Sequence, residues 1–265
     1  MQSYRLTRLG SMLLALLAVF AFGAITAAAA QAEEAPFWSR EGVRLQQNET
    51  HYITAKAWSS NFTLTAGTKT ITCEKVRLAE GVLLGSSTEN PGTNDEIIEF
   101  FGNCKVTNNG ASCKVKEPIR TNNVKSELVE SEKSATASLL VEFRPATGVK
   151  FVTISFEGTC TVNETAVEGS VAGQVFTLGA TQPELGELVK LPNGKKEAKS
   201  WLINFPATPV KSVWLVKEGT GKTESVGLKA FSEEAVLKGT ALVLLAHKNS
   251  SGEYISEEVN WSPLP

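Results

Sequence analysis

Glutamate is the most abundant side chain in this sequence that is suited to acid–base chemistry. The 265 residues include 28 acidic ones, and Asp95 is the only aspartate among them. Glu96 and Glu99 flank Ile97 and Ile98, just ahead of two phenylalanines. A glycosidase uses two carboxyl groups on either side of the bond that it breaks, so these glutamates are the candidate pair of a hydrolase. The same alternation of charged and apolar residues is also typical of the wet face of a β-strand.

The residue types that build other catalytic centres are scarce. His51 and His247 are the only histidines, and neither belongs to a metal-ligand pair, so we expect structural or surface roles for both. No serine stands in the G-x-S-x-G arrangement of a nucleophile elbow. The segment from Gly219 to Thr223 ends like a phosphate-binding loop but lacks its first glycine, which favours a hairpin turn. We therefore predict no cofactor and no metal, leave catalytic residues unassigned, and lean toward a protein that is not an enzyme.

Four cysteines form an even set, Cys73, Cys104, Cys113 and Cys160. In an exported protein such a set is expected to form two disulfides. The turn-forming segment from Asn108 to Gly110 favours a hairpin that joins Cys104 to Cys113, which leaves Cys73 for Cys160. A zinc site is the alternative, but paired short cysteine spacings and nearby histidines are missing.

Two tryptophans are candidate ligand contacts, because exposed aromatic rings on a β-sheet can stack on the apolar face of a sugar. Trp58 is the first candidate and Trp261, near the C-terminus, is the second. Packing at the end of a strand is the alternative for Trp58. Trp214 lies in the apolar run from Val213 to Val216 and is expected in the core.

Residues 1–32 have the pattern of a bacterial export signal. Arg5 and Arg8 form a basic start, the run from Leu9 to Ala30 is uncharged, and small residues end the segment. We predict cleavage after Ala32. An uncleaved membrane anchor is the alternative, because the apolar run approaches the ~20 residues that span a bilayer.

The charge of the remaining chain argues against nucleic acid as a partner. Removal of residues 1–32 takes away two arginines and no acidic residue, so the net charge changes from -2 to -4. The densest basic cluster is Lys195, Lys196 and Lys199, which is too small for a phosphate-binding stripe and is typical of a solvated turn. No later uncharged run has spanning length, so we expect no membrane-embedded domain after signal cleavage.

Apolar residues recur with a period of two along the mature chain. Val152, Ile154 and Phe156 share one parity, whereas residues 139–141, 213–216 and 241–246 are apolar on both, as in strands that are covered on both faces. Turn-forming sequences separate these runs. We predict an all-β fold, an antiparallel β-sandwich or barrel after an N-terminal signal helix. Residues 33–265 are predicted to form a single domain, with a possible sub-boundary in the weakly patterned stretch 177–199.

The layout resembles a family of secreted proteins of soil actinobacteria that has no assigned activity. The resembling residues are the signal segment, Ile71–Cys73, Phe101–Cys104 with Cys113 behind it, Phe156–Cys160 and Val167–Val171. The likeness covers residues 68–175 and rests on cysteine spacings and glycine–valine patterns. It implies export and a β-rich fold, and it carries over no catalytic or ligand residue.

These observations predict an exported, non-enzymatic protein that is secreted or held at the cell surface. Its role would be binding or structural, with a cell-wall glycan or a surface protein as partner. A secreted hydrolase that acts on a polysaccharide or an ester through glutamates is the alternative. The two hypotheses differ in what they require, because an enzyme needs two glutamates, or a serine and a histidine, that converge in one pocket.

Overall fold

The computed structural model describes residues 33–58, 61–134, 137–176, 189–190, 196–257 and 259–265. The predicted signal segment 1–32 and most of the stretch 177–199 lie outside these described residues. Glu33–Pro265 forms one compact unit. Its described residues form strands and turns without a helix, so the all-β prediction is confirmed. None of them belongs to a helix that is long and apolar enough to cross a membrane.

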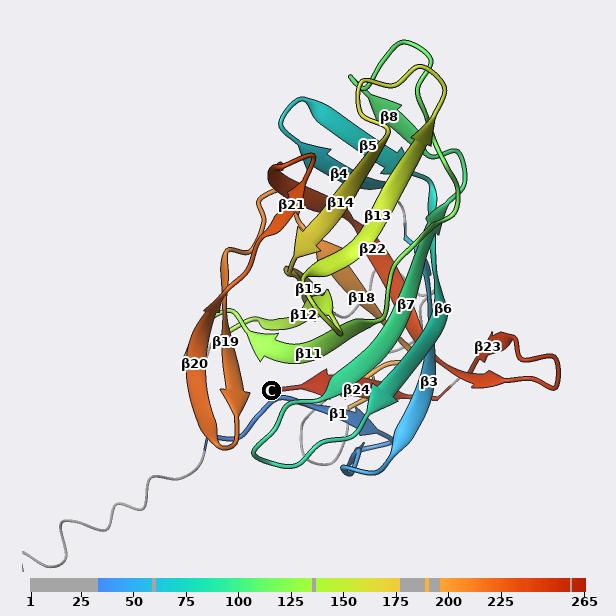
Figure 1. The fold of residues 1–265 in the computed structure, drawn as a ribbon. Helices are drawn as coiled ribbons and strands as arrows, with labels where there is room; N and C mark the ends of the chain where they lie inside the picture. The colour runs from blue at the N-terminus through green and yellow to red at the C-terminus, as the bar shows by residue number, and fades with distance from the viewer. Residues whose placement is uncertain (1–32, 59–60, 135–136, 177–188, 191–195, 258) are drawn as a thin grey trace, which may run out of the picture. The chain divides into compact units, whose positions relative to one another are not determined.

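Eight antiparallel strands close into a barrel within this unit (Figure 1). Each strand pairs with the next in the order β3-β6-β7-β11-β12-β15-β18-β22, and β22 pairs with β3 to complete the ring. The strands are β3 (Thr50–Ala57), β6 (Lys75–Leu84), β7 (Thr93–Phe101), β11 (Val124–Glu130), β12 (Leu139–Pro145), β15 (Val171–Phe176), β18 (Ser200–Phe205) and β22 (Glu233–Lys248). The stretch 177–199 thus joins two neighbouring strands of one barrel, β15 and β18.

A second antiparallel sheet continues from the barrel through the long strand β22 and occupies the upper part of Figure 1. Its order is β8-β5-β4-β22-β21-β14-β13-β9. The added strands are β4 (Phe62–Ala66), β5 (Lys69–Cys73), β8 (Lys105–Thr107), β9 (Lys114–Val115), β13 (Lys150–Glu157), β14 (Glu164–Gly169) and β21 (Leu228–Ala230).

Gly239 marks the point where β22 passes from one sheet to the other. Residues 235–238 pair with β4, whereas residues 241–246 pair with β3 and residues 239–244 pair with β18. Gly239 has φ +155°, and a Cβ at this position would lie 2.6 Å from Cδ1 of Phe62. Because glycine has no Cβ, the strand can bend here over the Phe62 ring.

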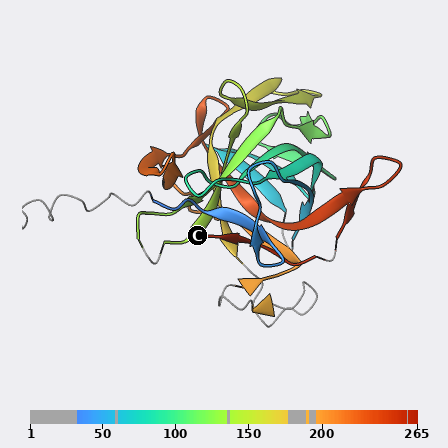
Figure 2. The same cartoon turned by 90° about the horizontal axis from the view of Figure 1, so that it is seen from below.

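A small sheet lies across one end of the barrel. It consists of β2 (Val43–Arg44), β1 (Phe37–Arg40) and β24 (Trp261–Leu264), and the view from below shows β1 and β24 side by side (Figure 2). The Trp38 and Trp261 rings have centroids 5.8 Å apart. The indole N–H of Trp201 on β18 donates to the carbonyl of Trp261 at 2.7 Å, which ties this sheet to the barrel wall.

Most of the remaining strands lie beside these sheets, whereas β16 and β17 form a separate two-stranded sheet. β10 (Ile119–Arg120) pairs with β7, β23 (Tyr254–Ser256) pairs with the end of β22, and β16 (Val189–Lys190) pairs with β17 (Lys196–Glu197). β19 (Ser212–Lys217) and β20 (Thr220–Ser225) form a hairpin beside β11.

Burial on both faces explains the continuous apolar runs. Val141 on β12 faces the barrel interior, whereas Leu140 packs outside against Val213 and Leu215 of the β19–β20 hairpin. The barrel covers only one face of the β19–β20 hairpin. Trp214 lies on the opposite face, where it is half-buried. The prediction that Trp214 belongs to the core is therefore wrong, because β19 is a side strand whose outer face meets solvent.

All four cysteines form disulfides, but the predicted pairing is wrong. Cys73 joins Cys104 and Cys113 joins Cys160. The chain does turn after Cys104, but the two sides of the turn enter different strand pairs: β8 pairs with β5, whereas β9 pairs with β13. The local turn alone favours the Cys104–Cys113 pair, but the sheet partners of β8 and β9 determine which cysteines meet.

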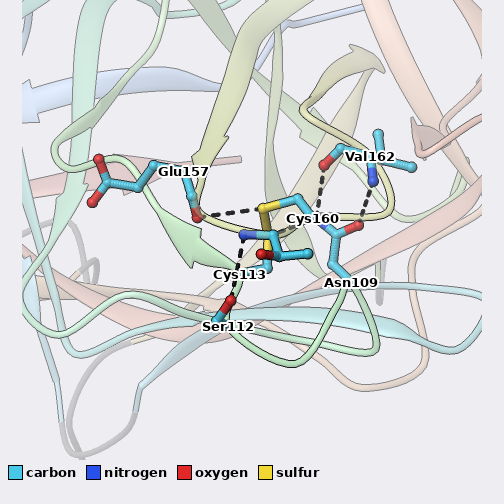
Figure 3. The surroundings of a disulfide bond; sticks show 7 residues. Asn109, Ser112, Cys113, Glu157, Cys160 and Val162 are labelled. Carbon is cyan, nitrogen blue, oxygen red and sulfur yellow. Dashed lines mark hydrogen bonds between the residues drawn. A yellow bond between two sulfur atoms is a disulfide. The ribbon is translucent and has the colours of Figure 1, made fainter.

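Asn109 holds the Cys113–Cys160 disulfide in place (Figure 3). Its fully buried amide donates to the carbonyl of Val162 at 2.9 Å and accepts from the N–H of Val162 at 2.9 Å. The same Nδ2 lies 3.2 Å from the Cys113 sulfur. These two backbone bonds join the turn before β9 to the turn after β13, which brings the two cysteines together.

Candidate functional site

The barrel strands, together with neighbouring strands of the second sheet, line an apolar cavity of about 130 Å³. Its wall is rich in aromatic rings from the barrel strands, from β4 and β13 of the second sheet and from the small end sheet. The lining rings are Phe62, Phe100, Phe143, Phe151, Phe205, Trp38, Trp201 and Trp261. An eight-stranded barrel has an interior that is either filled by side chains or wide enough for one small ligand. An engineered apolar cavity of about 150 Å³ binds benzene, so this volume suits a molecule of similar size.

One stretch of the cavity wall is polar. Asn94 and Glu96 on β7 face the cavity, as does Thr121 just before β11. Ser126 on β11 donates its hydroxyl to Oε1 of Glu96 at 2.6 Å, and the amide of Asn94 donates to the same oxygen at 3.1 Å. Thr121 accepts the N–H of Ile98 at 2.9 Å. The polar stretch therefore joins β7 and β11 around one buried carboxyl group, and Thr121 bonds to β7 two residues further along the strand.

Burial raises the pKa of Glu96, and the hydrogen bonds from Ser126 and Asn94 only partly oppose this effect. The side chain is 5% exposed. A buried carboxyl without a cationic partner is more stable in its protonated form, because the charged form loses its hydration. Glu96 therefore contributes a polar group to the cavity without favouring a fixed negative charge.

Glu99 does not meet Glu96, so the predicted glutamate pair does not form. The two residues are three positions apart on β7, and successive side chains of a strand point to opposite faces. Glu99 lies on the outer face, where its carboxylate contacts Arg77 at 2.6 Å and Arg120 at 2.7 Å. Burial opposes ionisation, but the hydrogen bonds and charges of these arginines outweigh it and lower the pKa of Glu99.

The tryptophan candidates differ in their exposure. Trp261 is 2% exposed and packs against Trp38 and Trp201, so the prediction of an exposed contact is wrong for this residue. Trp58 is half-buried on the outside of the barrel, where it packs against Leu202 and Leu242. The C-terminal position of Trp261 concealed its burial, because β24 returns to the chain start and pairs with β1.

The two histidines approach one acidic residue although they are far apart in sequence. His247 lies 3.6 Å from Glu257, and the guanidinium of Arg40 lies 3.8 Å from the same carboxylate. Arg40 also lies 3.4 Å from Nδ1 of His51. Burial and the Arg40 charge lower the pKa of His51, against the opposing charges of Glu49 and Glu257. The part of the chain that the structure describes holds no cluster of three or more such residues suited to a metal ion.

The period-two pattern around Glu96 contains a sequence signal for the polar stretch. The prediction of a glutamate pair makes no use of this signal. Asn94 and Glu96 share a parity with Ile98 and Phe100, and all four line the cavity. A glutamate on the apolar parity of a strand indicates a buried carboxyl rather than a wet face. Trp38 gave no such signal, because only the pairing of β1 with β24 brings it to the barrel end.

Comparisons with protein-family models, with curated proteins and with solved structures give no significant match. The cavity is therefore interpreted from its own geometry and chemistry.

Proposed function

We propose that this protein is an extracytoplasmic binding protein that holds a small apolar molecule inside its β-barrel. The observation that carries the proposal is the cavity of about 130 Å³, whose wall is made of apolar and aromatic side chains with one polar stretch. Ligand sites have this composition, because apolar walls provide affinity and a few polar groups orient the ligand.

The extracytoplasmic location is supported by two observations. The two disulfides suit an oxidising compartment, because cytosolic thiols are kept reduced. The export pattern of residues 1–32 agrees with this location. N-terminal sequencing of the protein released by an actinobacterial host tests the location, and Glu33 is the expected first residue. Full-length chain in the membrane fraction would contradict it.

The two functions expected from sequence receive less support from the geometry. A hydrolase needs convergent glutamates, and Glu96 and Glu99 lie on opposite faces of β7. A glycan-binding surface needs an exposed ring, and Trp58 is half-buried against Leu202 and Leu242. The cavity in the barrel interior therefore has more features of a ligand site than the two separated glutamates or the Trp58 surface.

Titration of the purified full chain with small aromatic molecules tests the proposal. Because Trp38, Trp201 and Trp261 line the cavity, bound ligand should change the tryptophan fluorescence saturably, at one molecule per chain. Ala55 faces the cavity from β3, so Ala55→Leu should fill it and weaken binding at least tenfold. Thr54→Leu is the matched control, because the neighbouring side chain points to the outer face.

Circular dichroism of both variants shows whether they fold. Binding that is unchanged in a folded Ala55→Leu variant would contradict the proposal. So would a complete failure of the wild-type chain to bind any of these molecules.

A further inference from the structure

Glu96 is the only ionisable side chain among the described residues that line the cavity. Both hydrogen bonds to its carboxyl group end on the same oxygen. Ser126 donates to Oε1 at 2.6 Å, and Asn94 donates to Oε1 at 3.1 Å. The other oxygen, Oε2, has no hydrogen-bond partner among the described residues. The carboxyl group therefore has one occupied oxygen and one that is left for a ligand.

A molecule in the cavity can reach Oε2. The unpartnered Oδ1 of Asn94 and Nε1 of Trp38 are fully enclosed, so a ligand cannot approach them. Oε2 of Glu96 is not one of the enclosed unpartnered atoms, and the exposed 5% of this side chain therefore includes it. Because Glu96 lines the cavity, the exposed oxygen faces the space that a ligand would occupy.

The surroundings of Glu96 place a proton on Oε2. Burial raises the pKa of Glu96, the hydrogen bonds to Oε1 only partly oppose this effect, and the charge of Asp95 raises the pKa further. Gly81 of β6 and Val124 of β11, the residues paired with it on either side, bring no positive charge. A protonated carboxyl group whose Oε1 already accepts two hydrogen bonds carries its proton on the other oxygen. Oε2 is then an O–H donor without an acceptor.

We infer that the cavity selects a small neutral molecule whose apolar body carries one hydrogen-bond acceptor, such as the carbonyl oxygen of a ketone. The Oε2–H group of Glu96 would donate to this oxygen, while the apolar and aromatic wall contacts the hydrocarbon body. A ligand without an acceptor leaves the donor unsatisfied in an apolar site, which disfavours its binding. This inference rests on the proposed function and names its ligand class.

Cyclopentanone and methylenecyclopentane test the inference, because they differ only by an oxygen in place of a CH₂ group and both are close to benzene in size. Water solvates the ketone more strongly, so the two affinities of the wild-type chain do not isolate the hydrogen bond. The ratio of ketone affinity to alkene affinity isolates it when wild type and variants are compared, because the difference in solvation cancels. Calorimetric titration of the full chain at pH 5 measures both affinities.

Variants of Glu96 assign the ratio to its O–H group. Glu96→Leu removes the donor and should lower the ketone-to-alkene ratio by about fivefold or more. Glu96→Gln keeps an acceptor in place of Oε1 and an N–H donor in place of Oε2, so it should retain the ratio. Asp95→Asn is the matched control, because Asp95 is exposed on the other face of β7 and its loss should leave the ratio unchanged.

The pH dependence distinguishes a hydrogen bond from a fit of shape. The ketone binds the protonated form of Glu96, so the wild-type ratio should be highest at low pH. It should fall as the pH rises through the folded pKa, which lies above the ordinary value of 4.5. Glu96→Gln has no proton to lose, so its ratio should stay constant over the same range.

The outcomes separate the two proposals. A ratio in folded Glu96→Leu that equals the wild-type ratio, or a wild-type ratio that rises with pH, overturns the acceptor inference and leaves the binding function in place. If Glu96→Leu does not fold, loss of the ratio in folded Glu96→Gln at pH 5 overturns the inference instead. Failure of both molecules to bind saturably overturns the proposed function itself.

Discussion

Glu96 and Glu99 stand three residues apart on β7, and they face opposite sides of the barrel wall. Glu96 lies inside without a cation, and burial raises its pKa. Glu99 lies outside between Arg77 and Arg120, and although burial opposes its ionisation these arginines lower its pKa. The same residue type on one strand therefore makes opposite contributions to the dependence of stability on pH.

Glu96 should make the protein less stable as the pH rises. In the unfolded chain this carboxyl loses its proton near its ordinary value of 4.5, whereas the folded chain keeps it to higher pH. The free energy of unfolding then falls by up to about 1.4 kcal/mol per pH unit between the two pKa values. Glu96→Gln keeps an acceptor for Ser126 and removes this slope. Urea unfolding at several pH values above 4.5 measures it, and parallel wild-type and variant profiles would refute the assignment.

Glu99 should show the opposite sign. Its lowered pKa stabilises the fold above the ordinary value of 4.5, and this contribution is lost as the pH falls through the folded pKa. Because Arg77 and Arg120 are 60% and 50% exposed, Glu99→Gln should cost only about 1 kcal/mol at neutral pH. Urea unfolding with the exposed-site control Glu80→Gln checks this value. A loss in Glu99→Gln that stays constant down to strongly acidic pH would exclude a charge effect.

Gly239→Ala should destabilise the junction of the two sheets by about 2 kcal/mol. The added Cβ would meet the Phe62 ring at 2.6 Å, and φ +155° disfavours any residue with a Cβ. Gly227→Ala is the matched control, because no atom lies within 4 Å of its added Cβ. Equal unfolding midpoints for the two alanine variants would show that β22 does not need the glycine bend.

The disulfide pairing gives a prediction that is independent of pH. Non-reducing peptide mapping should recover Cys73 linked to Cys104 and Cys113 linked to Cys160. The bridges span sequence separations of 31 and 47 residues, so loop-closure entropy predicts a contribution of about 4 kcal/mol each. Replacing Cys113 and Cys160 together by serine should lower the free energy of unfolding accordingly. Recovery of a Cys104–Cys113 peptide would instead restore the hairpin pairing.

The sequence predicted the local features of the fold and missed those that depend on distant partners. The period of two around Val152 and Ile154 appears as β13, and the apolar run 241–246 appears within the long strand β22. Local patterns report which residues are extended and which face is apolar. Strand pairing between remote segments leaves no such mark, and it determined both the disulfides and the burial of Trp261.

The candidate site was only partly visible from sequence for the same reason. The sequence indicates that Glu96 is chemically relevant, but it predicts a pair with Glu99 that the fold does not form. Its partner Ser126 comes from β11 and the cavity-lining Trp38 comes from β1, and these strands come together with β7 only after the barrel has closed. The sequence of one strand can thus reveal a buried polar residue. Which residues surround it depends on the register between strands, which the sequence of that strand does not show.

A crystal structure of the protein under xenon pressure tests the central claim, a ligand-accessible apolar cavity inside the barrel, most directly. Xenon binds apolar cavities of this size without needing a polar contact. We predict a xenon atom within the barrel, in contact with the Phe143 and Phe205 rings that line the cavity. An interior that stays free of xenon, with atoms only on the outer surface, would contradict the account.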